Sequence, residues 1–132
     1  MELNPVGNAG VRRPKKTVLV VEDDPDSREV FGELLRGQGH RVVAVGSGAA
    51  AMAYLRAQER PSVILLDMLM PEMDGWQFRR AQQADPELAS IPVVVVSALK
   101  AVENSAKRFG AVAFLGKPVA PEDLIGTIAK IA

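Results

Sequence analysis

The sequence predicts an α/β domain built on a doubly wound parallel sheet of five strands, and three observations support this prediction. Five short apolar runs rich in valine, isoleucine and leucine are spread along the chain. Amphipathic or alanine-rich stretches alternate with them, and glycine, proline and polar turn residues separate the two kinds of segment. Such an alternation requires right-handed crossovers, which place helices on both faces of a parallel sheet.

Length, composition and charge fit one soluble domain. The chain has 132 residues, 48% of them hydrophobic and 24% charged, which allows one sizeable core. The 16 Lys and Arg residues balance the 16 Asp and Glu residues, which argues against nucleic acid or an anionic membrane as the main partner. The absence of cysteine excludes disulfides, thiolate metal sites and thiol catalysis. No apolar run approaches the ~18 residues of a membrane span and no signal peptide is evident, so we expect a cytoplasmic protein.

The chain divides into a tail and one domain. Residues 1–15 contain prolines, glycines and basic residues without any period, which predicts a disordered tail or linker; a basic docking arm is the alternative. Residues 16–132 form the predicted domain. No internal repeat or second domain is expected.

The first strand is predicted over residues 17–21, and a helix follows it. Asp24 is placed to be the N-cap of this helix and Pro25 its first residue. Its apolar positions are expected to face the core. These positions are Val30, Phe31, Leu34 and Leu35. His40 lies in the next turn, where we expect it to be solvated and without a role.

The middle of the chain repeats this pattern. The second strand is predicted over residues 41–45, and Ser47 caps an alanine-rich helix that ends near residue 58. The third strand, residues 63–66, is a buried apolar run that ends at Asp67, and Asp74 caps the third helix. Asp67 itself could be a helix cap, but Asp74 is better placed for that role.

The last two strands also end in polar residues. The fourth, residues 93–96, is apolar at every position, which suits a strand covered on both faces, and it ends at Ser97. A weakly apolar helix is predicted over residues 101–109. The fifth strand, residues 112–115, precedes Lys117, and Pro121 begins the final helix.

The polar residues after four of these strands should lie close together. In a parallel sheet the carboxyl ends of the strands share one edge, where ligands bind. The residues concerned are Glu22, Asp23, Asp67, Ser97 and Lys117. Three converging carboxylates would repel one another, and a hard cation such as Mg²⁺ relieves that repulsion. A lysine and a hydroxyl beside them suit a phosphoryl group, which an aspartate can accept as a nucleophile. The pattern therefore indicates metal-assisted phosphoryl transfer to a carboxylate; a solvated acidic rim is the alternative.

The same residues carry a resemblance to a known family. The matching segments are Val20-Val21-Glu22-Asp23-Asp24, Leu66 to Gly75, Val96-Ser97-Ala98, and Gly110-Ala111 through Lys117-Pro118. Over about residues 16–132 the chain resembles a receiver domain of the bacterial two-component response regulators. The resemblance implies a flavodoxin-like (βα)5 fold with strand order 2-1-3-4-5, an order that the family shares with flavodoxin.

The resemblance also implies roles for individual residues. Asp67 would accept a phosphoryl group from a histidine kinase or a histidine phosphotransfer protein. Asp23, Asp67 and the backbone carbonyl of Leu69 would bind Mg²⁺, and Glu22 would act through water. Lys117 would pair with the phosphoryl group, aimed by a cis Lys117-Pro118 bond. The side chain of Leu69 would stand over the approach of a hydrolytic water.

Switching is implied by two further positions. Ser97 would bond to the phosphoryl group after the switch, and Phe114 matches an aromatic switch position. The change would alter binding to a downstream effector protein or domain, and a phosphorylation-dependent dimer is left open. The domain would be a switch and not an enzyme, beyond catalysing its own phosphorylation and dephosphorylation.

Three residues depart from the common pattern of the family. Glu22 stands where aspartate is common, and its longer arm could change the metal geometry. Ser97 replaces the frequent threonine, keeping the hydroxyl. Phe114 lacks a phenolic hydroxyl, so its burial would need no hydrogen-bond partner.

Three other functions would use parts of the same sequence pattern. Gly46-Ser47-Gly48-Ala49-Ala50-Ala51 fits the dinucleotide-binding pattern G-x-G-x-x-A, but it leaves the other strand-end residues unexplained. A phosphatase with an aspartyl-phosphate intermediate usually needs an acid two residues after its nucleophile, where this chain has Leu69. A receiver that has lost phosphorylation and only binds partners would not need all five site residues.

Overall fold

The computed structural model describes residues 16–57, 60–70 and 74–131, which form one five-stranded sheet with five helices. The strands are β1 (Thr17–Val21), β2 (Arg41–Val45), β3 (Val63–Asp67), β4 (Val93–Ser97) and β5 (Ala113–Gly116). The helices are α1 (Pro25–Gly37), α2 (Gly48–Ala57), α3 (Gly75–Ala84), α4 (Val102–Arg108) and α5 (Pro121–Lys130). All strand pairs are parallel, in the order β2-β1-β3-β4-β5, which confirms the predicted fold.

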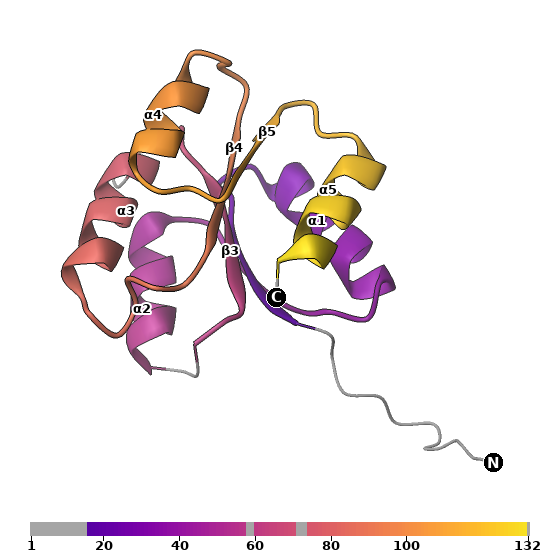
Figure 1. Cartoon of the computed structure of the whole chain (residues 1–132). Helices are drawn as coiled ribbons and strands as arrows, with labels where there is room; N and C mark the ends of the chain where they lie inside the picture. The colour runs from indigo at the N-terminus through magenta and orange to yellow at the C-terminus, as the bar shows by residue number, and fades with distance from the viewer. Residues whose placement is uncertain (1–15, 58–59, 71–73, 132) are drawn as a thin grey trace.

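The helices cover the sheet on both faces (Figure 1). α1 and α5 lie on one face, and α2, α3 and α4 lie on the other. Side chains alternate between the two faces along each strand. In β1, Val18 and Val20 pack with the α1 and α5 side chains, whereas Leu19 and Val21 belong to the cluster under the other three helices. The two central strands, β3 and β4, are buried at every position, as expected for strands covered on both faces.

Side-chain caps begin three of the helices as predicted. The Asp24 carboxylate accepts a hydrogen bond from the Ser27 N–H at 2.9 Å, and Pro25 follows as the first residue of α1. The Ser47 hydroxyl accepts from the Ala50 N–H at 3.0 Å at the start of α2. At α3 the Asp74 carboxylate accepts from the Gln77 N–H, and the Gln77 side chain accepts in return from the Asp74 N–H. These caps satisfy backbone donors that have no partner within a helix.

Two sequence predictions were wrong. Val30 does not face the core: it is 50% exposed, because Phe31 and Leu35 form the centre of the buried stripe of α1 and Val30 lies at its edge. His40 is buried, not solvated. The chain turns through Gly39, whose φ of 90° is in the left-handed region, and it enters β2 directly after His40.

Other boundaries differ by a residue or so. β3 and β4 include their terminal polar residues Asp67 and Ser97, and β5 begins after Val112, which is 56% exposed. The predicted tail over residues 1–15 lies outside the described residues. Among the residues that are described, no helix has the length and apolar character needed to span a membrane.

Candidate functional site

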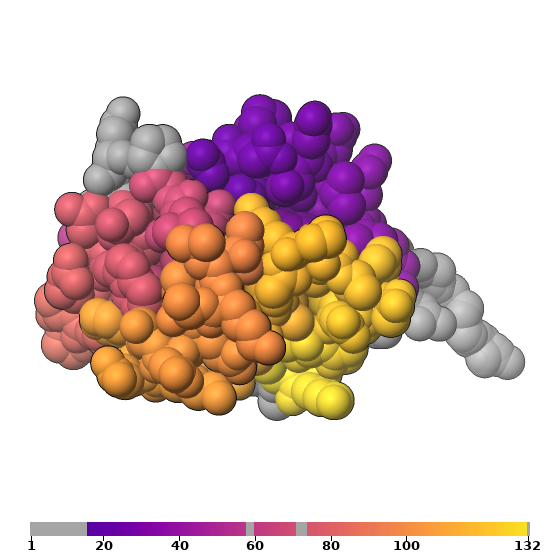
Figure 2. Space-filling model, turned by 90° about the horizontal axis from the view of Figure 1, so that it is seen from above, coloured from indigo at the N-terminus to yellow at the C-terminus, as the bar shows by residue number. Residues whose placement is uncertain are grey.

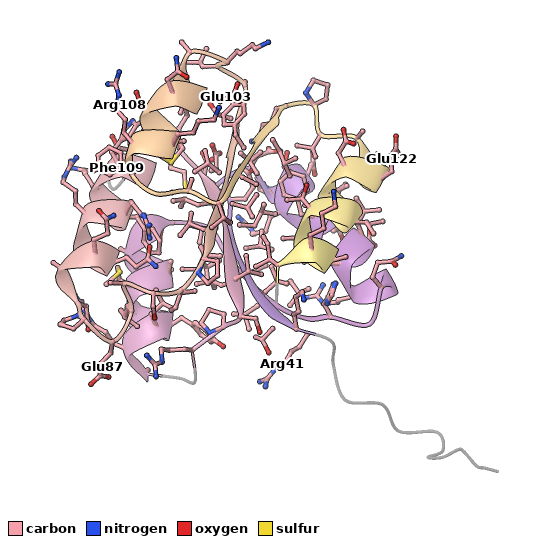
Figure 3. All side chains as sticks on the ribbon, in the orientation of Figure 1. Arg41, Glu87, Glu103, Arg108, Phe109 and Glu122 are labelled. Carbon is pink, nitrogen blue, oxygen red and sulfur yellow. The ribbon has the colours of Figure 1, made fainter. Side chains whose placement is uncertain are left out.

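The predicted site lies at the carboxyl edge of the sheet. Figure 3 labels Arg41, at the start of β2, on the lower edge, and Glu122, in the first turn of α5, near the upper edge. The strands therefore end at the top of the view, and Figure 2 looks down on that face. Segments from distant parts of the chain meet there, because the sheet order puts β1, β3 and β4 side by side.

Three carboxylates meet at this edge. Glu22 and Asp23 follow β1 directly, and Asp67 is the last residue of the neighbouring β3. One oxygen from each carboxylate lies within 4.8 Å of the others. Glu22 and Asp67 are buried, at 1% and 5% exposure, and Asp23 is half-buried. Oxygen ligands at this spacing suit a hard divalent cation, so the cluster has the composition of a Mg²⁺ site.

Lys117, which directly follows β5, reaches the cluster. The Lys117 ammonium lies 2.8 Å from Glu22 Oε1 and 3.4 Å from Asp67 Oδ2. The Lys117 ammonium thus forms a short ion pair with the buried Glu22 carboxylate. The Lys117-Pro118 bond is cis, as the resemblance implied. One ammonium facing three carboxylates leaves the cluster with excess negative charge when all three are ionised.

The local electrostatics follow from burial and crowding. Burial raises the pKa of Glu22 to about 7; Lys117 opposes this rise, and Asp67 adds to it. Burial would lower the pKa of Lys117, but the two carboxylates outweigh it and hold that pKa above its usual value. The lysine is therefore charged at neutral pH. Glu22, by contrast, is close to its midpoint and would gain from a divalent cation.

Two backbone amides fix the strand-end side chains. The Leu69 N–H donates to Asp67 Oδ1 at 3.0 Å, and the Leu99 N–H donates to the Ser97 hydroxyl at 3.1 Å. Ser97 is 1% exposed. Leu69 and Leu99 are 45% and 53% exposed, so two apolar side chains stand in solvent beside the acidic cluster.

A close backbone contact connects Asp67 to the start of α3. The Gly75 N–H donates to the Met68 carbonyl at 3.1 Å. A Cβ on Gly75 would come within 2.6 Å of the Met68 Cα, which no real side chain could do. Glycine is therefore required at the first position of α3, because this position packs directly against the backbone of Met68, the residue after Asp67.

The remaining predicted positions lie near the site. Phe114 is half-buried and packs against the core cluster on the α4 side of the sheet, opposite Val95 of β4. The Lys117 N–H donates to the Ser97 carbonyl at 2.9 Å, which connects the two strand ends.

A surface pocket of about 490 Å³ adjoins Lys117. Its lining includes Val30, Phe31 and Val119.

Arg28 lies beside the site, although no role was predicted for it. Arg28 lies in α1, and its guanidinium donates to the backbone carbonyl of Glu22 at 2.9 Å. A basic residue one helical turn after the Asp24 cap is the signal that could have indicated it. Gly46, from the G-x-G-x-x-A segment, lies next to this guanidinium. The structure therefore shows another use for the first glycine of that pattern.

Comparisons with known proteins point to one family. Residues 18–129 match the family model described as the response regulator receiver domain. Protein PilH of Pseudomonas aeruginosa is 35% identical over 113 residues, covering 84% of this chain and 93% of that protein. The two-component response regulator ORR3 of Oryza sativa is 38% identical over 120 residues, covering 86% of this chain and 88% of that one.

Solved structures agree with the sequence matches. The crystal structure of a response regulator receiver protein from Pseudomonas putida superposes with a TM-score of 0.81 at 31% identity, covering 91% of this chain and 98% of that one. Receiver domains are signalling switches that interact with kinases or phosphotransfer proteins and with effectors. On these findings the chain belongs to the response regulator receiver domain family of two-component signalling.

Proposed function

We propose that this domain is a Mg²⁺-dependent switch in which Asp67 accepts a phosphoryl group from a histidine kinase or a histidine phosphotransfer protein. The observation that carries the proposal is the convergence of three carboxylate oxygens within 4.8 Å, with the Lys117 ammonium 3.4 Å from Asp67 Oδ2. Strand ends far apart in the sequence supply these groups. A solvated acidic rim would not require two of the three carboxylates to be buried.

The residues present fit Mg²⁺. The pKa of Glu22 is raised to about 7 although Glu22 pairs with Lys117, so the lysine alone does not neutralise the cluster. Asp23, Asp67 and the Leu69 carbonyl would hold the ion directly, and Glu22 would do so through water. When bound, the ion neutralises charge on the carboxylates and on the incoming phosphoryl oxygens.

The chain's own groups account for the transfer. A carboxylate oxygen of Asp67 attacks the phosphorus, the P–N bond to the donor imidazole breaks, and its electron pair returns to the ring. Lys117, charged at neutral pH, would pair with the transferred group instead of with Asp67 and Glu22. The pocket beside Lys117, which is lined in part by the exposed Val30, would give a donor protein access to this side of the site.

The output would pass through Ser97 and Phe114. The Ser97 hydroxyl now accepts a hydrogen bond from the Leu99 N–H, and it would turn to donate to a phosphoryl oxygen. Such a turn would draw the segment after β4 toward the site, and Phe114 would become more buried behind it. An effector protein or domain would read the change, and self-association in the phosphorylated state remains an expectation.

Metal dependence of phosphorylation tests the proposal. The protein is incubated with phosphoramidate in either Mg²⁺ or EDTA, and its intact mass is followed over time. We expect the mass of one phosphoryl group to be gained in Mg²⁺ and little or none in EDTA. Equal labelling in the two buffers, or none in either, would refute the proposed function.

A further inference from the structure

Arg28 holds the backbone of the two residues that bring carboxylates from β1 to the site. One guanidinium nitrogen lies 2.9 Å from the Glu22 carbonyl oxygen and 3.4 Å from that of Asp23. Both carbonyls belong to the turn between β1 and α1, and Arg28 itself lies in α1. The side chain therefore connects the helix to the turn that precedes it.

Other contacts fix the ends of this turn but not its middle. The Glu22 N–H donates to the Val45 carbonyl at 3.1 Å, which continues the pairing of β1 with β2. The Asp24 N–H donates to Glu22 Oε2 at 3.2 Å, and the Asp24 carboxylate caps α1. Asp23 lies between these anchors. Within the described residues, the Asp23 carbonyl accepts a hydrogen bond from Arg28 and from no other side chain.

Gly46 leaves the space that Arg28 occupies. A Cβ built on Gly46 would lie 2.9 Å from the Arg28 guanidinium nitrogen and 3.7 Å from its central carbon. Gly46 is not among the glycines with positive φ, so the backbone conformation here does not demand glycine. The absent side chain matters because it gives room to the guanidinium. An alanine would displace the end of a flexible side chain and leave the fold intact.

We propose that Arg28 is a positioning residue for the Mg²⁺ site, and that Gly46 permits this role by leaving room for its guanidinium. The inference rests on the proposed function, since it assumes that the carboxylates bind the ion. Arg28 would act by holding the Glu22 and Asp23 backbone so that their carboxylates converge on Asp67. Outer partners that orient metal ligands typically change metal affinity by roughly 10–100-fold when they are lost.

The direction in which Mg²⁺ affinity changes on replacing Arg28 distinguishes a positioning role from a purely electrostatic one. A cation beside a metal site opposes Mg²⁺ binding through space, so removing only its charge should tighten the binding. Removing a positioning group should weaken it. Gly46→Ala adds a second test, because this variant keeps the positive charge and only moves the guanidinium.

The experiment measures the Mg²⁺ dissociation constant by titration calorimetry at about 0.15 M ionic strength, where long-range charge effects are screened. The variants are Arg28→Gln, Gly46→Ala and the double variant. Arg36→Gln is the matched control, since Arg36 lies on the same helix and donates to the Val42 carbonyl at 3.3 Å, away from the carboxylates. Urea unfolding in EDTA gives the stability of every variant without metal.

We expect the dissociation constant to rise about tenfold for Arg28→Gln and several-fold for Gly46→Ala, with Arg36→Gln within twofold of the parent. The double variant should bind no more weakly than Arg28→Gln, because Gly46 acts through Arg28. Unchanged or tighter binding in Arg28→Gln would overturn the inference, as would an equal loss in Arg36→Gln. A parent protein that binds no Mg²⁺ would overturn the proposed function as well, whereas a parent that binds normally confines any failure to Arg28.

Discussion

The two exposed leucines beside the carboxylates indicate how long a phosphoryl group should last. Loss of the group by hydrolysis requires a water in line with the phosphorus. The Leu69 N–H donates to the Asp67 carboxylate, and the Leu99 N–H donates to the Ser97 hydroxyl. The side chains of both leucines are exposed. Neither side chain can hydrogen-bond a water, so both would hinder its placement.

We therefore predict that Leu69→Asn loses phosphate about tenfold faster than the parent, since a water-positioning contact is worth on the order of 1–2 kcal/mol in the barrier. Leu69→Met keeps an apolar side chain of similar size and should decay at the parental rate. The measurement is single-turnover decay of the phosphorylated protein after removal of the phosphodonor. An unchanged rate in Leu69→Asn would show that only the backbone of residue 69 matters.

Glu22 should make the metal-free protein pH-sensitive. Its pKa is about 7 when folded, against an ordinary value of 4.5 in the unfolded chain. Between these values the folded state holds a proton that the unfolded state has released, so the free energy of unfolding falls as pH rises through this window. Added Mg²⁺ should counteract the loss at the upper end.

Urea unfolding in EDTA from pH 4.5 to 7.5 tests this prediction. Glu22→Gln should remove most of the fall in stability, whereas Glu122→Gln, at an exposed position on α5 (Figure 3), should keep the parental slope. A parental protein whose stability is constant or rises across this range would contradict the raised pKa.

Among the elements, α4 is tied to α3 by polar contacts at its C-terminal end, whereas its first turn is held by apolar packing of the buried Val102. The Phe109 carbonyl, just after α4, accepts hydrogen bonds from Arg79 at 2.9 Å and from Gln83 at 3.2 Å, both on α3. The centres of the Phe109 and Trp76 rings lie 4.9 Å apart. The other end begins at Ala101, where no side chain caps the helix. α4 should therefore move at its first turn and pivot on its last.

Hydrogen exchange with and without beryllofluoride, a phosphoryl analogue, tests this prediction. We expect changed protection from Ser97 through the first turn of α4 and around Phe114, with little change at Phe109. Ser97→Ala lacks the hydroxyl that couples to the phosphoryl oxygens, so its response should be much weaker. No difference anywhere between residues 97 and 114 would contradict the proposed switch.

The same element shows where sequence reasoning fell short. The apolar pattern of α4 is weak, and it gave no indication that the end of this helix is anchored to α3 by polar contacts. Arg79 is buried, and it also donates to Gln82, whose amide donates to the Leu88 and Ile91 carbonyls. Arginine and glutamine on a helix are normally expected to face solvent, so the apolar periodicity of the sequence cannot reveal such a buried polar network.

At the scale of the whole molecule, the fold was predictable because its signals are local and mutually consistent. Apolar strand runs, helix caps such as Asp74 and turn glycines all agree with one alternating pattern. The strand-end residues were predictable as a group for the same reason, since parallel topology brings strand ends together. Packing of single residues was not: Val30, His40 and Arg28 depend on which atoms face them across the fold, and no local pattern encodes this.

Asp67 should be the only phosphoacceptor, because its carboxylate is the group toward which Lys117, the acidic cluster and the Leu69 amide converge. The most direct measurement compares intact masses of the parent and Asp67→Asn after incubation with phosphoramidate and Mg²⁺. Asp85→Asn, at the C-cap of α3, is the control for loss of an unrelated aspartate. We predict one added phosphoryl group in the parent and in Asp85→Asn, and none in Asp67→Asn. An Asp67→Asn protein that still gains one phosphoryl group would contradict the account.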